Sequence, residues 1–395
     1  MERFGDKVQC NPTVKLKKGK QYPLVDIDKI IPGYKFVSNV EVCDYNGQGG
    51  AKYQNRDVLM ARITPCLENG KIALADIQGN EGIGSTELLV FRGIDGVSDT
   101  DYIYYLLNTK YMRQLAANSM TGASGRQRAD LKFIKKIPWK FPALKQQKEI
   151  SAVLSQYDNL IVINKKRIKL LETTAQQLYK EWFVRFRFPG YEKAKFVDGI
   201  PQGWEIVPIG TQCEVVGGAT PSTEVPSNWN GDIKWVTPTD ITRKNALPLI
   251  DIEGRITMKG LKSCATKLLP PETILMTSRA SIGYIGLTKD SVCTNQGFIS
   301  VLPNYPNMKM YFVYMLLSRR DELINYANGS TFLEISRSNF KKLKMLLPSE
   351  NILHQFENIT ANIFDEEYAL EQQNKHLTKQ RDLLLPRLMS GKLAV

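Results

Sequence analysis

Histidine is almost missing from this chain of 395 residues, which has only His354 and His376, too far apart to share one helical turn. The H-E-x-x-H zinc motif, the phosphate-binding loop ending in Gly-Lys-Ser/Thr and the glycine fingerprint of dinucleotide-binding domains are also missing. So are the Asn-Pro-Pro-aromatic and Asp-Pro-Pro-Tyr tetrapeptides of amino-methyltransferases. One carboxylate pair, Asp251 and Glu253, leaves a nuclease open, although its place beside Gly254 is typical of an exposed turn. The sequence therefore predicts a chain without a catalytic centre.

Long hydrophobic runs are missing too. No window approaches the roughly 18 apolar residues that a membrane span requires, and residues 1–6 lack the hydrophobic core of a signal peptide. The six cysteines show no C-x-x-C spacing, which favours reduced thiols over a disulfide framework or a metal site. We expect a soluble cytoplasmic protein with no membrane partner.

Positive charge, in contrast, is abundant. Lys and Arg outnumber Asp and Glu by 53 to 40, a formal charge of +13, which attracts polyanions. Nucleic acid is therefore favoured as a partner, with an unspecialised basic protein as the alternative. The length and the hydrophobic content of 43% predict a globular chain with two or more cores.

The two halves of the sequence repeat each other with an offset of about 210 residues. Five matches occur in the same order, which chance does not explain. They are Val58–Ile63 with Ile274–Arg279, Tyr104–Leu107 with Tyr314–Leu317, Gly122–Arg128 with Gly329–Arg337, Phe133 with Phe340 before lysine pairs, and Phe141-Pro142 with Leu347-Pro348.

Each half predicts an α+β domain. Short apolar runs broken by Gly and Pro, such as Ile233–Val236, Thr273–Met276 and Cys293–Val301, predict strands of a mixed sheet. Apolar residues at helical spacing predict helices over Tyr102–Ala117 and Met310–Tyr326.

A long helix is predicted after each half, with apolar residues at the alternating spacing of a coiled coil. Asn164 is a polar interface position that would fix the register, Thr360, Glu367 and Arg381 are polar positions in the second helix, and Pro386 should end that helix. The predicted interface residues are Ile150, Leu154, Tyr157, Ile161, Asn164, Leu171 and Leu178 in the first helix, and Phe356, Ile363, Leu370, Asn374, Leu377 and Leu384 in the second.

The predicted organisation is two globular domains, residues 1–143 and 204–347, followed by helical spacers with their linker or tail, residues 144–203 and 348–395. Each helix of roughly 35 residues would be about 50 Å long. The simplest arrangement packs the two helices antiparallel as a coiled-coil spacer, in a pseudo-two-fold duplication with a domain at each end. The alternatives are that each helix packs on its own domain or mediates homodimerisation.

Several segments resemble type I restriction-modification specificity subunits, and the resemblance covers essentially the whole chain. The segments are Gly217–Ser222, Trp229–Ile241, Thr277–Gly283 and Gly329–Thr331 in the second domain, with Glu181–Phe186, Pro189-Gly190 and Leu384–Gly391 at the helix ends. The first half has no counterpart of Gly217–Ser222 or of the Asn228–Gly231 segment.

The resemblance implies a non-catalytic subunit whose two target recognition domains each read half of a bipartite, asymmetric double-stranded DNA site. It also implies that the helices dock two DNA methyltransferase subunits. Restriction subunits are a further partner that it leaves open. S-adenosylmethionine, ATP and Mg would be needed only by the partner subunits, so no cofactor or metal is expected in this chain.

DNA readers need phosphate contacts for affinity and base-edge contacts for discrimination, and Arg, Asn and Gln read bases best. Gln127 between two arginines, Arg62 and Arg279 are the preferred base readers, with solvated loops or structural ion pairs as alternatives. The candidate DNA-binding residues are Arg62, Arg126, Gln127, Arg128, Lys135 and Lys136 in the first domain, and Thr239, Arg243, Lys244, Thr277, Ser278, Arg279, Ser336, Arg337, Lys341 and Lys342 in the second.

Two other functions remain open at this point. A self-contained DNA-acting enzyme would cut DNA without partner subunits. A coiled-coil adaptor with incidental charge would bind DNA weakly and without sequence preference.

Overall fold

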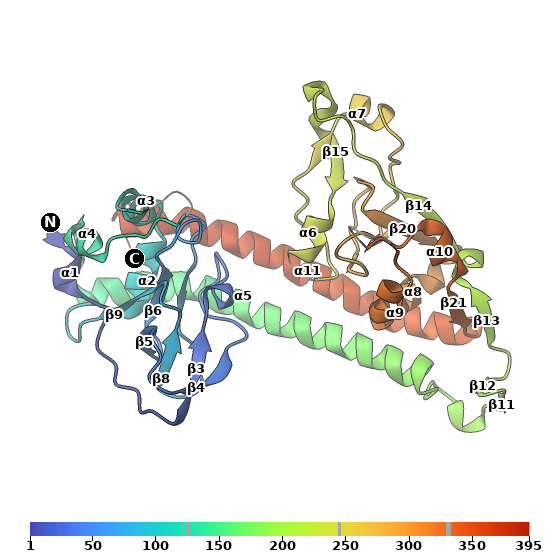
Figure 1. The fold of residues 1–395 in the computed structure, drawn as a ribbon, viewed down its shortest axis with the longest axis horizontal. Coiled ribbons are helices and arrows are strands. Elements are labelled where there is room, and N and C mark those ends of the chain that lie inside the picture. The colour runs from blue at the N-terminus through green and yellow to red at the C-terminus, as the bar shows by residue number, and fades with distance from the viewer. Residues whose placement is uncertain (123–125, 244–245, 329–332, 395) are drawn as a thin grey trace. The chain divides into compact units, whose positions relative to one another are not determined.

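The computed structural model of the chain describes residues 1–122, 126–243, 246–328 and 333–394 (Figure 1). Its internal contacts divide the chain into unit 1, Met1–Ile163 with Asn374–Val395, and unit 2, Asn164–Gln373. Each unit holds one globular domain together with a segment of each of two long helices, α5 (Leu144–Tyr179) and α11 (Glu350–Met389). The two units are described separately below.

Unit 1 contains two four-stranded sheets and one short strand pair. The first sheet is antiparallel, in the order β2 (Val8–Cys10), β9 (Leu88–Gly93), β6 (Val58–Ala61), β7 (Ile72–Leu74). The second sheet has the order β4 (Glu41–Tyr45), β3 (Lys20–Val25), β8 (Glu81–Gly84), β5 (Ala51–Gln54), with β3 and β8 parallel. β1 (Glu2–Arg3) pairs with β10 (Pro138–Trp139).

The helices of unit 1 are short apart from the segments of α5 and α11. They are α1 (Phe4–Lys7), η1 (Ile27–Lys29), α2 (Thr100–Asn108), α3 (Lys110–Asn118) and α4 (Leu131–Lys136). The predicted helix over Tyr102–Ala117 is thus two helices. Thr109 divides them because its backbone is extended and its side chain accepts a hydrogen bond from the Met112 amide, as an N-cap of α3.

Unit 2 repeats this topology except that its second sheet has three strands in the described residues, where that of unit 1 has four. Its four-stranded sheet has the order β14 (Cys213–Gly217), β20 (Phe298–Pro303), β17 (Ile274–Thr277), β18 (Ile285–Gly286), and its second sheet the order β16 (Arg255–Ile256), β15 (Trp229–Val236), β19 (Val292–Thr294), with β15 and β19 parallel. β13 (Glu205–Pro208) pairs with β21 (Lys344–Leu347), and β11 (Phe196–Val197) with β12 (Ile200–Pro201). The predicted duplication is confirmed by the strand orders.

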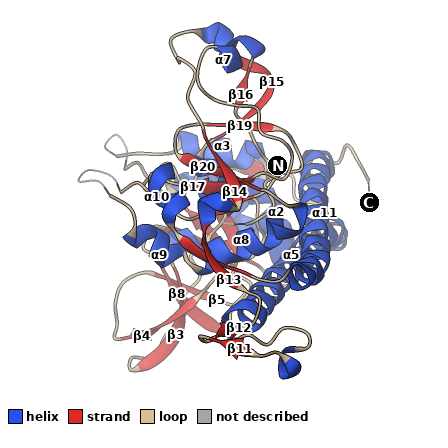
Figure 2. Cartoon of the chain, turned by 90° about the vertical axis from the view of Figure 1, so that its right-hand side faces the viewer, coloured by secondary structure: helices blue, strands red, loops and turns tan. Residues whose placement is uncertain are grey.

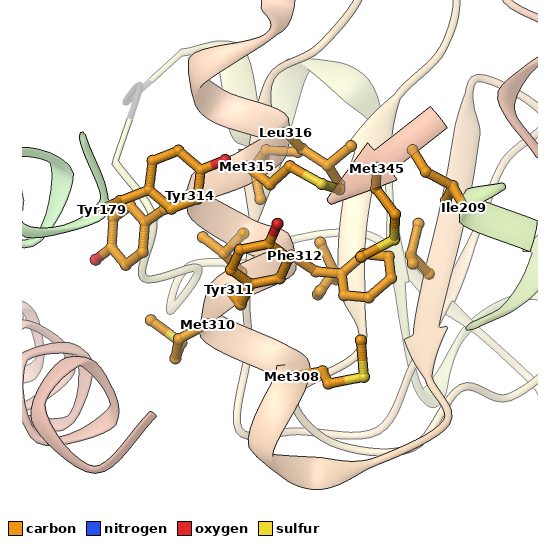
Figure 3. Packing of buried hydrophobic residues seen from close by; sticks show 14 of the residues in the cluster. Tyr179, Ile209, Met308, Met310, Tyr311, Phe312, Tyr314, Met315, Leu316 and Met345 are labelled. Carbon is orange, nitrogen blue, oxygen red and sulfur yellow. The ribbon is translucent and has the colours of Figure 1, made fainter. Parts of the chain in front are cut away.

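Among the described residues, unit 2 has more short helices than unit 1, ten against five. Those of unit 2 are a π-turn η2 (Lys180–Val184), η3 (Tyr191–Lys193), η4 (Ile209–Thr211), η5 (Pro226–Asn228), α6 (Pro238–Thr242), α7 (Met258–Lys262), η6 (Pro306–Met308), α8 (Lys309–Ser318), α9 (Arg320–Asn325) and α10 (Arg337–Lys342). Figure 2 shows α7 with β15 and β16 projecting from the rest of unit 2. The core of unit 2 gathers around α8, where Tyr311, Phe312 and Met315 are buried (Figure 3).

The start of each domain is fastened to its last short helix in the same way. The Phe4 amide donates to the Ile137 carbonyl at 2.9 Å, and the Ile209 amide donates to the Leu343 carbonyl at 2.7 Å. Gly5 allows the close approach of α1 and α4, since a Cβ there would lie 2.9 Å from Lys135 Cβ. The offset between equivalent helices is 206 residues, both from α4 to α10 and from α5 to α11. Residues of these helices that are 206 positions apart are therefore equivalent.

In each unit the segments of α5 and α11 run antiparallel and contact each other. Arg381 is ion-paired with Asp158 in unit 1, and Asn164 donates to Gln373 at 2.8 Å in unit 2. The same segments join the hydrophobic cores of the domains, through Leu154 in unit 1 and Phe356 in unit 2. The predicted antiparallel pairing is therefore confirmed within each unit, and the alternative, packing of a helix on a globular domain, is present as well.

Eight of the predicted helix-interface residues are buried, and five are only partly buried. An α-helix has 3.6 residues per turn, so a strict repeat of 3.5 residues drifts around the helix, and a predicted position can be partly buried while its neighbour is buried. The buried set is Ile150, Leu154, Ile161, Asn164, Phe356, Leu370, Asn374 and Leu377, and the partly buried set is Tyr157, Leu171, Leu178, Ile363 and Leu384. Asp158, Phe364 and Leu385 are buried beside Tyr157, Ile363 and Leu384.

The prediction that Pro386 ends the second helix is wrong, because α11 continues to Met389. Proline cannot donate to the carbonyl four residues earlier. Its own carbonyl is still available, and it accepts a hydrogen bond from the Ser390 amide at 3.1 Å. The loss of one bond near the end of a 40-residue helix is tolerated.

Candidate nucleic-acid interface

Loops from four parts of unit 2 meet at one edge of its four-stranded sheet. The Ala219 amide donates to the Thr294 carbonyl at 3.0 Å, the Ser278 amide to the Gly297 carbonyl at 2.8 Å, and the Ile335 amide to the Ser278 carbonyl at 3.0 Å. We call these joined loops, residues 218–222, 278–282, 295–297 and 333–337, the loop cluster. Several of the predicted DNA-binding residues lie on it or beside it.

Arg279 is the best placed arginine of the loop cluster. Its side chain is 49% exposed, and its Nε donates to Glu334 at 3.1 Å. The pairing leaves the terminal guanidinium nitrogens available, which is the geometry that reads guanine bidentately. Arg279 therefore forms a structural ion pair, which was the alternative to base reading, and its side chain is accessible as well.

Thr277 and Ser278 are removed from the candidate set by the structure. Their exposed fractions are 0% and 2%. Thr277 Oγ1 accepts from the Tyr284 amide at 3.0 Å and donates to the Ser281 carbonyl, which braces the turn after β17. The predicted strand Thr273–Met276 stops before both residues, whereas β17 extends to Thr277.

Two further predicted groups flank the loop cluster. Thr239 is exposed on α6, and Arg243 forms an ion pair with Glu253 at 3.6 Å. Glu253 is one of the two carboxylates that left a nuclease open in the sequence. Lys244 lies outside the described residues.

α10 presents its predicted residues on the surface. Ser336 is the N-cap of α10, and its side chain accepts from the Asn339 amide at 3.2 Å. Arg337, Lys341 and Lys342 are exposed. The guanidinium of Arg337 lies over Gly217, where a Cβ would be 3.1 Å from its Cζ, so this arginine reaches the loop after β14.

Gln296 is an exposed residue of the loop cluster that the sequence analysis missed. Thr220 Oγ1 donates to Gln296 Oε1 at 2.7 Å, which orients the amide group and leaves its nitrogen free to donate. A Cβ on Gly218 would lie 2.2 Å from the Thr294 carbonyl oxygen, so the glycine allows these two loops to touch. Gln296 falls inside the predicted strand segment Cys293–Val301, which the structure divides into β19 and β20.

In unit 1 two of the predicted arginines converge on one carboxylate. Arg128 forms a bidentate pair with Glu87, with contacts of 2.6 to 3.0 Å, and Arg62 Nε lies 3.9 Å from it. The hydrogen bonds from Arg128 lower the pKa of Glu87. Arg62 and Arg128 remain 35% and 42% exposed.

The other predicted residues of unit 1 are also accessible. Arg126, Lys135 and Lys136 are exposed, and Gln127 is partly buried with its carbonyl accepting from the Thr64 amide at 3.0 Å. The neighbouring residues 123–125 lie outside the described part.

The strand registers show which positions of the two domains are equivalent. Ala61 pairs with Leu88, and Thr277 pairs with Phe298, so Arg62 corresponds to Ser278 and Ile63 to Arg279. The predicted match of Val58–Ile63 with Ile274–Arg279 has the same register, so Arg62 and Arg279 occupy positions one residue apart. By the same comparison, Glu87 is equivalent to Gly297 and Arg128 is equivalent to Glu334. The two domains therefore carry different side chains on the same backbone frame.

Metal-binding clusters and membrane-spanning helices are both absent from the part of the chain that the structure describes. In that part of the chain, no group of three or more His, Cys, Asp or Glu side chains is arranged to hold a metal ion. None of its helices combines the length and the apolar character needed to cross a bilayer.

Comparison with known proteins gives the family. A model described as the type I restriction modification DNA specificity domain matches the chain twice, at residues 12–173 and 201–378. The type I restriction enzyme MjaIX specificity subunit of Methanocaldococcus jannaschii is 32% identical over 200 residues, 50% of this chain and 46% of that protein. The HindI specificity subunit of Haemophilus influenzae is 24% identical over 425 residues, 90% of each chain.

The fold is shared with a solved structure. The type I restriction-modification system S subunit from M. genitalium matches with a TM-score of 0.57 and 15% identity, over 98% of this chain and 95% of that one. The chain spans about half the length of the MjaIX relative but nine-tenths of the HindI relative. With two matched domains that cover most of its length, the chain belongs to the type I restriction-modification DNA specificity family.

Proposed function

We propose that this chain is the subunit that gives a type I restriction-modification complex its DNA sequence specificity, with each globular domain reading one part of a two-part site. The observation that carries the proposal is the pair of domains with one topology and different side chains at equivalent loop positions. Equivalent frames can approach DNA in the same way, while different side chains select different bases. The site should therefore be asymmetric.

The finer parts of this proposal concern partners and chemistry. Two methyltransferase subunits would dock on α5 and α11, and restriction subunits are a further candidate partner. S-adenosylmethionine, ATP and Mg would be bound by those partners, and this chain would contribute no catalytic group. The proposed setting is the cytoplasm.

A DNA-binding assay with the purified chain tests the proposal. Binding should be strong for duplexes that carry the two-part site and weaker by a factor of about 10³ or more for unrelated duplexes. A chain that cuts DNA with divalent metal alone would support the nuclease alternative. Equal, weak affinity for all duplexes would support the coiled-coil adaptor.

Arg279→Ala and Lys341→Ala are expected to act differently. Loss of a base contact at Arg279 should cost about 1–3 kcal/mol and relax the preference at one position of one half-site. Loss of a phosphate contact at Lys341 should weaken binding to every duplex alike and reduce the salt dependence. Competition binding with single-base variants of the site measures both effects. Equal losses on every sequence for both variants would remove Arg279 from the base readers.

Gln296→Ala is expected to weaken recognition of one half-site by about 1–3 kcal/mol, since an amide can pair bidentately with adenine. Thr220→Val should reproduce part of this loss because it removes the hydroxyl that orients Gln296. Gln202→Ala, also in unit 2 but exposed beside the β11–β12 hairpin, is the matched control. If Gln296→Ala and Gln202→Ala bind all duplexes like the unmodified chain, Gln296 does not read a base.

A further inference from the structure

Each unit contains a cavity between one of the long helices and its globular domain. The volume is about 440 Å³ in unit 1 and about 410 Å³ in unit 2, and both values are within the range of about 300–1,000 Å³ that is typical of ligand pockets. The cavity of unit 1 is lined by α11, by the end of α2 with the first turn of α3, and by the turn between β6 and β7. No candidate DNA-binding residue is among the described residues that line either cavity.

The two cavities occupy equivalent places in the repeated fold. Gly70 and Gly283 line them, and each lies two residues before the strand that returns from the turn, β7 or β18, in strand pairs of the same register. Asp382 of α11 and Gln176 of α5 also line them and are 206 positions apart. The repeated frame therefore forms a cavity twice, and the side chains on its wall decide what each one can bind.

In unit 2 the protein itself satisfies the arginine that lies over this glycine. A Cβ on Gly283 would lie 2.7 Å from Arg320 Cγ. Arg320 Nε donates to the Ile282 carbonyl at 3.0 Å, and its guanidinium stacks on Tyr284 with 4.0 Å to the ring centroid. Glu172 adds a carboxylate to the wall of the same cavity. The cavity of unit 2 thus has acceptors of its own.

In unit 1 the arginine over the equivalent glycine lacks such partners. A Cβ on Gly70 would lie 2.6 Å from Arg113 Nη1, so the glycine leaves room for this guanidinium. Arg113 Nε is buried, and no described residue accepts a hydrogen bond from it. Lys110, exposed and three residues earlier on α3, lines the same cavity. Neither side chain has an ion-pair partner within residues 1–122, 126–243, 246–328 and 333–394.

The remaining charged groups of this wall neutralise each other. Asp382 is the one carboxylate among the described lining residues, and Arg381 Nη2 lies 2.8 Å from it. Arg381 is also ion-paired with the buried Asp158 at 2.5 Å. Lys110 and Arg113 are therefore left as an excess of positive charge at the cavity, and an anion would compensate it.

A phosphate group has the chemistry that these two side chains favour. A guanidinium can donate two parallel hydrogen bonds to phosphate oxygens, and a lysine ammonium pairs with phosphate as a point charge. A DNA duplex is far larger than this cavity, and Arg113 is partly buried in it. A small molecule is therefore favoured over the DNA backbone as the source of the phosphate.

We propose that the cavity of unit 1 binds a small phosphate-bearing ligand, whose oxygens pair with the guanidinium of Arg113 and the ammonium of Lys110. Unit 2 does not share the site, because Arg320 already has its partners and Glu172 lines the cavity. A ligand that binds the folded state alone stabilises it, so the ligand would stabilise unit 1 and not unit 2. This site is separate from the DNA-reading surfaces and goes beyond the proposed function.

The experiment is a titration of the full chain with inorganic phosphate, at an ionic strength kept constant with chloride, followed by thermal unfolding and by hydrogen exchange. Phosphate should raise the unfolding temperature and protect amides around the cavity of unit 1. Arg113→Gln and Lys110→Gln should each weaken phosphate binding by about 10-fold or more, because each removes a charge-assisted contact. Lys132→Gln, which removes an exposed lysine of α4 outside the cavity, is the matched control and should bind phosphate like the unmodified chain.

A second titration, with a nucleoside monophosphate, identifies the source of the phosphate group. Tighter binding than that of inorganic phosphate, with the same loss in Lys110→Gln, would support the proposal with a nucleotide as the ligand. Equal or weaker binding, again lost in Lys110→Gln, would support it with free phosphate as the ligand.

Three results would overturn the proposal, and each leaves the DNA-specificity role standing. The first is the absence of any phosphate effect on the unmodified chain. The second is equal phosphate binding by Lys110→Gln, Lys132→Gln and the unmodified chain, which would show a general effect of the salt. The third is weaker binding of Lys110→Gln to every DNA duplex with no effect of small phosphates, which would assign the site to the DNA backbone. Lys110 is exposed, so an unchanged unfolding temperature of Lys110→Gln in chloride excludes misfolding.

Discussion

Arg381→Ala is expected to lower the free energy of unfolding of unit 1 by about 3–5 kcal/mol, because it leaves the carboxylate of Asp158 buried without its cation. The side chains of Arg381 and Asp158 are 7% and 2% exposed, and their charged groups are 2.5 Å apart. Tyr105 donates to the other oxygen of Asp158 at 2.5 Å, and Arg381 also donates to the Gly33 carbonyl at 2.9 Å. The loss should be measured by urea denaturation, with hydrogen exchange to assign it to unit 1.

Unit 2 provides the matched control for this ion pair. The equivalent positions there are Phe364 and Ala175, both buried. Combining Asp158→Phe with Arg381→Ala should therefore recover most of the loss, since a buried ion pair and well-packed apolar residues are often nearly equal in stability. A single variant as stable as the unmodified chain, or a combined variant no better than the single one, would contradict this view of the helix interface.

Glu367→Ile is expected to stabilise unit 2, most strongly at alkaline pH. The pKa of Glu367 in the folded chain is about 8, raised by burial and by Glu172, against an ordinary value of 4.5. Below pH 4.5 this carboxyl is protonated in both the folded and the unfolded chain, so its raised pKa costs no stability. As the pH rises from 4.5 to about 8, the unfolded chain ionises the group and the folded chain does not, so the free energy of unfolding falls by up to about 5 kcal/mol.

The measurement is the free energy of unfolding of both chains at pH 6 and pH 8.5, without partners. The gain from Glu367→Ile should be larger at pH 8.5 than at pH 6. Glu149→Ile, at a position of α5 where the glutamate side chain is 42% exposed, should show no such pH-dependent gain. Parallel pH profiles for Glu367→Ile and the unmodified chain would mean that Glu367 is ionised at an ordinary pKa.

The features that sequence periodicity predicts are those that depend on local repeats. The two long helices, their antiparallel pairing and the α+β duplication follow from apolar spacing and from matched segments such as Tyr104–Leu107 and Tyr314–Leu317. These patterns fix which face of an element is apolar. They do not fix the last turn of each element, which is why Pro386 and the break at Thr109 were missed.

The loop positions could be predicted only in part, because they depend on contacts between distant segments. Arg279 and Arg128 are near the loops expected for them, but their carboxylate partners Glu334 and Glu87 have no spacing that a sequence reveals. The side chain of Gln296 is oriented by a hydrogen bond from Thr220, which lies on another loop. Thr277 and Ser278 resemble loop residues by type, yet both are buried, and the Ser278 backbone pairs with Gly297 and Ile335.

Replacing residues 1–143 with the corresponding domain of another specificity subunit, followed by mapping of methylated adenines in DNA treated with the resulting methyltransferase complex, tests the account most directly. The unmodified chain should direct methylation to a motif with two separate specific parts, and the replacement should change one part and leave the other intact. A continuous motif, or a replacement that alters both parts together, would contradict the assignment of one reading surface to each domain.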